Sequence, residues 1–405
     1  MFVRELALTD FRSWDRVELE LEPGPTIFVG RNGFGKTNLL ESLFYVATLR
    51  SHRVSGDGPL VRTGATAARV FTTVHNEGRE LSVDLTIAAQ GANKAQINTA
   101  PVRRTREILG ILRTVLFAPE DLALVRGDPG ERRRFLDEIV VQLRPLAAGS
   151  RADYERVLRQ RSALLKTAGA AMRRSSADAD SVMSTLDVWD EQLAQFGAEV
   201  TADRLAVIAQ LDPLVTQAYA SIAPHSRPAH IAYRSAAGPE VDASPGGPAA
   251  VEEIRQILAQ RLHEVRSKEI DRGLCLIGPH RDDLFLGLGT EPAKGFASHG
   301  ESWSFALALR LACVDLLRTD GVEPVIMLDD VFAELDTARR QKLAEFTASA
   351  EQLLITAAVG EDIPQVLAGR RISVGVQEHD GVRRSVILDD HTVAEPSQSR
   401  PQEES

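Results

Sequence analysis

The chain has 405 residues, 43% of them apolar, which suffices for two or three packed domains, and no apolar run approaches the roughly 20 residues of a membrane span. Its net charge of −10 argues, taken alone, against nucleic acid as a partner. The chain has two cysteines, Cys275 and Cys313, which are too few for a zinc site or a disulfide framework, and we expect both to lie in the core. The charged N-terminus does not resemble a signal peptide. Together these features lead us to expect a cytoplasmic protein.

Short strands dominate the first hundred residues and are separated by glycine, asparagine and charged turns. The predicted strands cover residues 2–9, 17–21, 26–29, 68–75 and 81–88. After the third of them, residues 38–46 have apolar side chains at three- and four-residue spacing, which predicts an amphipathic helix.

The loop between that strand and that helix matches the phosphate-loop pattern G-x-x-x-x-G-K-[ST]. It consists of Gly30, Arg31, Asn32, Gly33, Phe34, Gly35, Lys36 and Thr37. Backbone N–H groups of such a loop surround phosphate oxygens, the lysine reaches the β- and γ-phosphates, and the threonine hydroxyl binds Mg²⁺. A glycine-rich turn entering a helix is the alternative, but strand, loop and helix in this order favour a nucleoside triphosphate site.

The pattern becomes helical from about residue 130 to residue 270 and returns to strands after residue 274. Helices are predicted over residues 154–165, 186–211 and 251–272, with breaks at 168–184 and at the Pro- and Gly-rich residues 235–249. The predicted organisation is one α/β nucleotide-binding domain in two halves, residues 1–125 and 274–392, a mainly helical insert, residues 126–273, and a disordered acidic tail, residues 393–405.

A second part of the nucleotide site is predicted at the end of a buried strand, where the apolar residues 325–328 are followed by Asp329 and Asp330. A magnesium-assisted NTPase needs a carboxylate there to hold the metal, and a second one to polarise the attacking water. We assign these roles to Asp329, together with Thr37, and to Asp330. The alternative is that the two aspartates only cap the following helix. The presence of a phosphate loop in the same chain makes this alternative the weaker one.

Residues 298–301, Ser-His-Gly-Glu, open a predicted helix over residues 304–317, and the acidic strand follows. An ordinary helix cap would explain this segment alone. Its place upstream of the acidic strand instead resembles the ABC-type ATPases, in which a serine-glycine signature of one subunit closes over the γ-phosphate held by another. Asp336, six residues beyond Asp330, fits the same pattern.

The order of motifs further resembles the RecF family of recombination-repair ATPases across residues 1 to about 390. Besides the phosphate loop, the matching segments are Leu8-Thr9-Asp10-Phe11-Arg12-Ser13-Trp14, Ser51-His52-Arg53, Phe117-Ala118-Pro119-Glu120-Asp121-Leu122, Glu131-Arg132-Arg133-Arg134-Phe135-Leu136-Asp137, Gly278-Pro279-His280-Arg281-Asp282-Asp283-Leu284 and Asp329-Asp330-Val331-Phe332-Ala333-Glu334-Leu335-Asp336. The resemblance implies an ABC-type P-loop ATPase head, a mixed sheet with helices, interrupted by the helical domain.

The resemblance also implies a bacterial cytoplasmic, nucleoid-associated protein that binds ATP, Mg²⁺ and DNA and forms an ATP-bound homodimer. Such a protein acts at single-strand gaps with RecO- and RecR-type mediators, helps to load the RecA recombinase, and supports replication restart and the SOS response. Its DNA-stimulated ATP hydrolysis is slow. Arg12 would lie near the nucleotide, while Ser298, Gly300, Glu301 and Asp336 would engage ATP or the partner subunit across the dimer.

One segment departs from the family pattern, which has a Ser-Gln-Gly-Gln type signature followed by an arginine. Here the sequence is Ser298-His299-Gly300-Glu301-Ser302-Trp303. A carboxylate near a γ-phosphate is unfavourable unless it points away or pairs with an arginine. The departure therefore bears on ATP-driven closure and not on ATP binding.

Candidate DNA contacts lie in the stretch from residue 100 to 175, which holds 16 Lys and Arg against nine Asp and Glu. They form two clusters, Arg103, Arg104 and Arg106, and Arg132, Arg133 and Arg134. Arginines of this kind neutralise backbone phosphates without reading sequence, and few aromatic residues are interleaved for base stacking. A solvated helix face paired with Glu131, Asp137 and Glu138 is an equal alternative for the individual arginines.

Three other classes of protein share the nucleotide chemistry. A transporter ATPase has its signature roughly a hundred residues after the phosphate loop, whereas Ser298 lies 262 residues after Lys36. A long-armed SMC protein needs several hundred residues of heptads, whereas this insert is short and is expected to be broken at Pro213 and residues 235–249. An ATP-dependent clamp, in which turnover serves only release, is compatible with every motif.

Overall fold

The computed structural model describes residues 1–379 and 382–391, so the predicted disordered tail, residues 393–405, lies outside the described residues. The chain forms two compact units. The first unit contains Met1–Pro119 and the chain from Val322 onward, and the second unit contains Glu120–Gly321. This division differs from the predicted domain boundaries, because residues 274–321 contribute two strands and two helices that pack with other elements of the second unit.

An antiparallel sheet of the first unit has the strand order β2-β1-β4-β5-β6-β7. Its strands are β1 Phe2–Phe11, β2 Trp14–Glu20, β4 Ala67–Asn76, β5 Arg79–Ala88, β6 Lys94–Ile97 and β7 Ala100–Pro101. Buried and exposed residues alternate along β2, so one face of the sheet is packed and the other solvated.

A second sheet of the first unit has the order β15-β14-β3-β13-β12-β8 and carries the segments predicted to bind nucleotide. Its strands are β3 Gly24–Val29, β8 Thr114–Phe117, β12 Val325–Asp329, β13 Gln352–Ala357, β14 Arg370–His379 and β15 Val382–His391. All pairs are parallel except β14 with β15. Every residue of β12 and β13 is buried, as is typical of central parallel strands.

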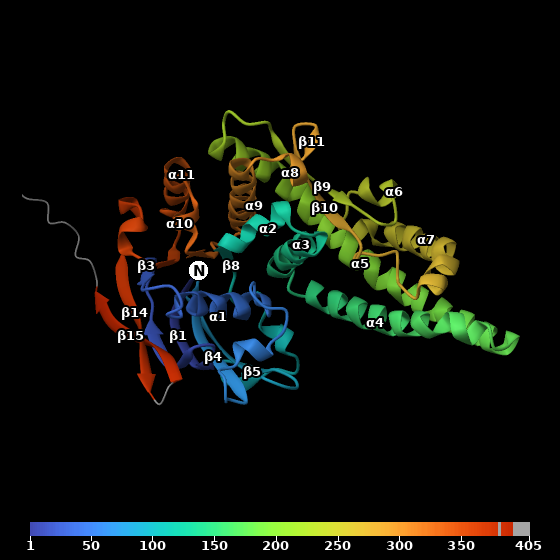
Figure 1. The fold of residues 1–405 in the computed structure, drawn as a ribbon, viewed down its shortest axis with the longest axis horizontal. Coiled ribbons are helices and arrows are strands. Elements are labelled where there is room, and N and C mark those ends of the chain that lie inside the picture. Colours follow the sequence, from blue (N-terminus) through green and yellow to red (C-terminus); the bar gives the residue numbers. More distant parts are fainter. Residues whose placement is uncertain (380–381, 392–405) are drawn as a thin grey trace, which may run out of the picture. The chain divides into compact units, whose positions relative to one another are not determined.

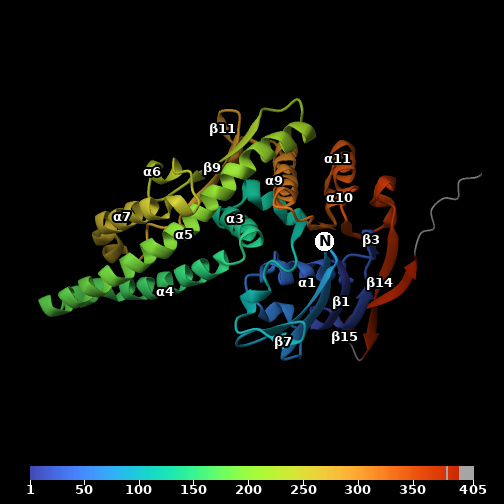
Figure 2. The same ribbon diagram turned by 180° about the vertical axis from the view of Figure 1, so that it is seen from behind.

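Helix α1, Lys36–Thr48, packs in the core between the two sheets of the first unit (Figures 1 and 2). All but one of its residues are buried, which explains its apolar sequence around Leu39 and Leu43. The helices α10 Val331–Glu334 and α11 Thr337–Thr347 follow β12. Since β3 ends at Val29 and β12 at Asp329, and β13 lies between them, the phosphate loop and Asp329 meet at one edge of the sheet.

The second unit is mainly helical, and its helices α4, α5 and α7 lie side by side (Figure 1). Its helices are α2 Leu122–Arg126, α3 Pro129–Leu143, α4 Ala147–Met172, α5 Ser176–Ile222, α6 Pro239–Asp242, α7 Val251–Arg272, α8 Ala293–Phe296 and α9 His299–Thr319. A small sheet, β11-β10-β9, consists of β9 Ala229–Arg234, β10 Asp283–Leu288 and β11 Glu291–Pro292.

The expected break at Pro213 is wrong, because α5 runs through it for 47 residues. Proline removes one backbone donor from a helix, but Leu211 and Val215 on either side are fully buried, and their packing outweighs the loss of that hydrogen bond. Residues 168–184 likewise form no long break, since α4 extends to Met172 and α5 begins after Ser175, whose side chain accepts a hydrogen bond from the N–H of Asp178.

Cys275 and Cys313 are both free and buried, as predicted. Within the described residues, we find no helix that combines the length and the apolar character needed to cross a bilayer.

Candidate functional site

The loop after β3 needs glycine at two positions of its phosphate-loop pattern. Gly35 has φ +95°, and a Cβ atom at this residue would lie 2.3 Å from the Ser385 hydroxyl oxygen. A Cβ atom on Gly30 would lie 2.3 Å from the carbonyl oxygen of Val374. Only glycine fits at these two positions, so the first and last glycines of the pattern are required by the packing of the loop against β14 and β15.

Lys36, the first residue of α1, folds back over this loop. Its ammonium group donates to the carbonyl of Gly30 at 2.8 Å and lies 3.4 Å from the Asn32 side-chain oxygen and 3.9 Å from Asp330 Oδ2. The side chain is only 3% exposed, so its charge is concentrated at the loop. An ammonium group held among loop carbonyls is placed to exchange these acceptors for phosphate oxygens.

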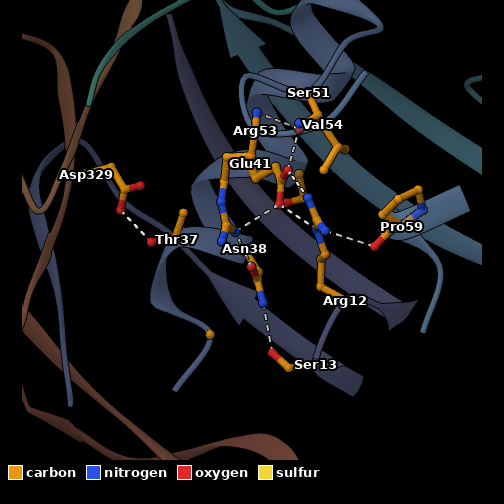
Figure 3. A network of polar contacts seen from close by, with 12 residues as sticks. Arg12, Ser13, Thr37, Asn38, Glu41, Ser51, Arg53, Val54, Pro59 and Asp329 are labelled. Atoms are coloured by element: carbon orange, nitrogen blue, oxygen red, sulfur yellow. Dashed lines mark hydrogen bonds and ion pairs between the residues drawn. The ribbon is translucent and has the colours of Figure 1, made fainter. Parts of the chain in front are cut away.

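Thr37 and Asp329 come together although 292 residues separate them (Figure 3). The Thr37 hydroxyl donates to Asp329 Oδ1 at 2.8 Å, and the Thr356 hydroxyl donates to the same oxygen at 2.6 Å. Thr356 was not predicted. The feature of the sequence that could have identified it is a polar residue near the end of the apolar strand β13, and the structure places it directly beside Asp329 in the sheet register.

Asp330 has φ +47°, a left-handed conformation that is costly for a residue with a side chain. Its backbone N–H donates to the Thr356 hydroxyl at 2.9 Å, which fixes this turn. The two adjacent aspartates therefore separate: Asp329 is buried at Thr37, whereas the half-exposed Asp330 side chain faces Lys36.

The hydroxyl of Thr37 and the carboxylate of Asp329 are the hard oxygen ligands that Mg²⁺ takes from proteins, usually one or two together with substrate phosphates. The residues present therefore fit a magnesium-bound triphosphate. Among the described residues, no group of three or more His, Cys, Asp or Glu side chains is arranged to hold a metal ion.

Arg12, predicted to lie near the nucleotide, is bound to α1 by Glu41 (Figure 3). Its guanidinium donates to both carboxylate oxygens of Glu41, at 2.8 and 2.6 Å, and to the carbonyl of Pro59 at 3.0 Å. The Ser51 hydroxyl donates to Glu41 at 2.5 Å, and Arg53 lies 3.6 Å from it. Glu41 was missed because its partners are distant in sequence.

Glu41 is completely buried, yet it is held as a carboxylate. Burial raises the pKa of a carboxyl group, but here the hydrogen bonds from Arg12 and Ser51, and the charge of Arg12, outweigh it and lower the pKa of Glu41 below its ordinary value of 4.5. The network therefore ties the segment before β2 to the helix that follows the phosphate loop.

Replacement of Glu41 by glutamine is expected to lower the free energy of unfolding by about 3 kcal/mol at pH 7, because Arg12 loses its buried partner. The folded-state pKa of Glu41 lies below the unfolded one, so its stabilisation is present above pH 4.5 and is lost as the pH falls through the folded pKa. Urea unfolding at pH 7 and at pH 3 measures the difference, which should shrink at the lower pH. An equal difference at both values would contradict this account of Glu41.

A further set of side chains supports the phosphate loop from β2 and β15. The Trp14 indole N–H donates to the carbonyl of Gly35 at 3.1 Å, and Trp14 is fully buried. The Ser13 hydroxyl contacts the amide of Asn38 at 2.8 Å and the hydroxyl of Ser385 at 2.7 Å. These contacts fix the loop at its junction with α1.

The segment from Ser298 to Glu301 begins helix α9 in the second unit. The Ser298 hydroxyl accepts from the N–H of Glu301 at 3.2 Å, and the Glu301 carboxylate accepts from the N–H of Ser298 at 2.9 Å, a reciprocal capping box. Ser298 and His299 are exposed, and Gly300 is half-buried in the first turn. In the first unit, Asp336 caps α11 by accepting from the N–H of Arg339 at 2.9 Å.

Glu301 also pairs with an arginine, one of the two arrangements that relieve its charge. Arg227 lies 3.3 Å from Glu301 Oε1, and the Ser226 hydroxyl donates to the same oxygen at 3.2 Å. The hydrogen bond from the Ser298 N–H is the largest influence, and with the Arg227 and Ser226 contacts it lowers the pKa of Glu301. Arg227 was not predicted, since nothing in the sequence links it to residue 301.

The two arginine clusters differ. Arg132 is buried and binds both oxygens of Asp283, at 2.7 and 2.9 Å, so it is a structural residue and its prediction as a DNA contact is corrected. Arg133 donates to the carbonyl of Asp282 at 2.7 Å, and Arg134 pairs with Glu131 at 3.2 Å.

The cluster of Arg103, Arg104 and Arg106 lies on the first unit. Arg103 and Arg104 are exposed, Arg106 is half-buried, and among the described residues none of the three guanidinium groups forms an ion pair. This cluster therefore fits phosphate contact better than the cluster at residues 132–134.

The chain is similar to known proteins over nearly its whole length. A protein-family model described as RecF/RecN/SMC N terminal domain matches residues 2–380. The chain is 56% identical over 396 residues to the DNA replication and repair protein RecF of Rhodococcus erythropolis (strain PR4), covering 96% of this chain and 97% of that protein.

Two solved structures have the same fold. One, described as the recombination mediator protein RecF-ATPrS in the RecFOR pathway, is similar with a TM-score of 0.80 and 25% identity, over 95% of this chain and 98% of that one. The other, the Smc head domain of Pyrococcus furiosus bound to the C-terminal domain of ScpA, has a TM-score of 0.51 and 18% identity, over 96% of each chain. The predicted ABC-type α/β head with a helical insertion is thereby confirmed.

Proposed function

Because this chain belongs to the RecF family, we propose that it is an ATP-dependent DNA-binding protein of recombinational repair and replication restart. The observation that carries the proposal is the contact between Thr37 and Asp329 at 2.8 Å. It joins the phosphate loop to the acidic strand, and these two elements are the parts that P-loop ATPases use to hold a magnesium-bound triphosphate.

The residues of the site divide the work between binding and hydrolysis. The backbone of residues 30–37 and the N-terminus of α1 surround the triphosphate, and Lys36 supplies a point charge to its β- and γ-phosphates. Thr37 and Asp329 would hold Mg²⁺, which when bound neutralises charge on the phosphates. Thr356 keeps the Asp329 carboxylate turned toward Thr37.

Asp330 is the residue that polarises the attacking water. Its left-handed backbone separates its side chain from Asp329 and leaves it half-exposed beside the phosphate loop. A carboxylate in this position orients water and accepts its proton. Arg12 acts on the nucleotide site indirectly, because its guanidinium is bound to Glu41 of α1, the helix that follows the phosphate loop.

A second copy of the chain completes the site. Ser298 and Gly300 lie in the first turn of α9 and are accessible, so the signature of one copy can meet the triphosphate held by another. Asp336, exposed at the start of α11, is assigned to the same interface. ATP then acts mainly as a switch for dimerisation, and slow, DNA-stimulated hydrolysis releases the dimer.

Family membership supports the biological role that we propose. We assign to the protein binding at single-strand gaps and duplex junctions, cooperation with RecO- and RecR-type mediators, assistance in loading RecA, and support of the SOS response, in the cytoplasm at the nucleoid. The name of the similar structure, a recombination mediator in the RecFOR pathway, supports this assignment.

Sedimentation with and without ATP and a gapped duplex tests the proposal. The wild type should dimerise with ATP and bind the duplex. A variant with Arg103→Ala, Arg104→Ala and Arg106→Ala should bind DNA more weakly, and the slope of log Kd against log salt should fall by about two to three. Arg134→Ala, which removes an arginine paired with Glu131, is the matched control. A wild type that stays monomeric and does not bind the duplex would refute the proposed function.

A further inference from the structure

The acidic residue of the signature is held by the connection between α5 and β9. Glu301 Oε2 accepts from the N–H of Ser298 at 2.9 Å, whereas Glu301 Oε1 faces Ser226 at 3.2 Å and Arg227 at 3.3 Å. One carboxylate thus joins the first turn of α9 to a loop more than 70 residues away. The two carboxylate oxygens therefore have different partners: Oε2 caps α9, and Oε1 binds the loop between α5 and β9.

The loop that carries Arg227 is fixed on both sides. The hydroxyl of Tyr219, a buried residue of α5, contacts the Ser226 hydroxyl at 2.9 Å, and its ring lies 5.6 Å from the ring of Phe305 in α9. On the other side, the N–H of Gly289 donates to the carbonyl of Pro228 at 2.8 Å. The guanidinium of Arg227 is therefore presented to Glu301 by a loop anchored on α9 itself.

The charge of Glu301 makes this arrangement necessary. A carboxylate in the first turn of α9 lies where the proposed function brings the γ-phosphate of the second copy, and two anions repel each other. A cap formed by serine and glutamine would satisfy the same N–H groups without that charge. In this chain, Arg227 supplies the compensating positive charge and Ser226 keeps the carboxylate turned to the side.

We propose that Arg227 is a positioning residue of ATP-driven dimerisation, which neutralises Glu301 and holds its carboxylate away from the phosphate that the signature receives. The inference rests on the proposed function and adds the loop of residues 223–228 to its machinery. It also explains how the chain closes over an anion without the neutral signature typical of its family.

The test is the dissociation constant of the dimer formed with a non-hydrolysable ATP analogue and Mg²⁺, measured by sedimentation velocity. Arg227→Glu should weaken the dimer about tenfold or more, since it places a second carboxylate beside Glu301. Arg227→Lys should stay within about threefold of wild type, because it keeps the charge. Binding of the analogue to the monomer should not change in either variant, because the phosphate loop lies in the first unit.

Rescue separates positioning from a general loss of structure. Adding Glu301→Gln to Arg227→Glu should recover a large part of the lost dimer affinity, because the neutral amide still accepts from the Ser298 N–H and one carboxylate instead of two then remains at this position. Arg234→Glu is the matched control, since Arg234 is exposed on β9 and pairs with Asp242 at 3.4 Å. It should leave the dimer unchanged.

The experiment distinguishes failure of the proposed function from failure of the role proposed for Arg227. A wild type that remains monomeric with the analogue would refute the proposed function and this inference with it. A wild type that dimerises while Arg227→Glu dimerises equally well, or an Arg227→Glu defect that Glu301→Gln does not reduce, would overturn the inference alone.

Discussion

Replacement of Lys36 by alanine is expected to raise the dissociation constant for ATP at least about a hundredfold, because charge-assisted hydrogen bonds to the β- and γ-phosphates are lost. The side chain is almost completely buried and lies within the loop, so its charge acts directly at the bound phosphates. The variant should fold, since the Lys36 ammonium bonds mainly to loop carbonyls and not to the core. Isothermal titration with ATP and Mg²⁺ measures the change.

Lys342→Ala is the matched control for this substitution. Lys342 is exposed on α11, in the same unit, and lies 3.5 Å from Glu345. Its loss should leave ATP affinity within about twofold of the wild type, because exposed ion pairs contribute little. Micromolar binding retained by Lys36→Ala would contradict the assignment of residues 30–37 as the triphosphate site.

Replacement of Asp330 by asparagine is expected to lower the rate of ATP hydrolysis about a hundredfold or more and to leave ATP binding intact. The amide can still accept a hydrogen bond from water but cannot take its proton. Asp329 and Thr37, which would hold the metal, are unchanged, and loss of the negative charge 3.9 Å from Lys36 does not oppose phosphate binding. Single-turnover hydrolysis together with equilibrium binding separates the two effects.

The Asp330→Asn variant should also accumulate as an ATP-bound dimer, because closure precedes hydrolysis in the proposed sequence. Glu345→Gln, an exposed carboxylate on α11, is the control and should hydrolyse ATP at the wild-type rate. Hydrolysis by Asp330→Asn at more than about a third of the wild-type rate would exclude Asp330 as the group that activates water. A clamp that uses turnover only for release would then need another base.

Local patterns were sufficient to predict the parts of the nucleotide site. A phosphate loop between strand and helix, and an apolar strand ending in Asp329, are encoded in contiguous residues. Their meeting at one sheet edge follows from parallel pairing of β3 and β12 with β13. The predicted break at Pro213 was wrong, because the burial of a long helix outweighs the loss of one backbone hydrogen-bond donor.

Residues that act through distant partners could not be predicted. Glu41 contacts Arg12 across 29 positions, and Glu301 contacts Arg227 across 74. Arg132 and Arg103 are equally basic in sequence, yet one is buried against Asp283 and the other is exposed. Only the tertiary structure shows whether an arginine is structural or available to a ligand, because this depends on whether a carboxylate lies within ion-pair distance of it.

In the proposed dimer, the phosphate loop of one copy is completed by the signature of another. Mixing Lys36→Ala protein with Ser298→Arg protein tests it, since the mixed dimer has one site with an intact Lys36 from one copy and an intact Ser298 from the other. Neither variant alone should sediment as a dimer with ATP and Mg²⁺, whereas the mixture should form a dimer containing both. A mixture that stays monomeric, while the wild type dimerises under the same conditions, would contradict the composite site.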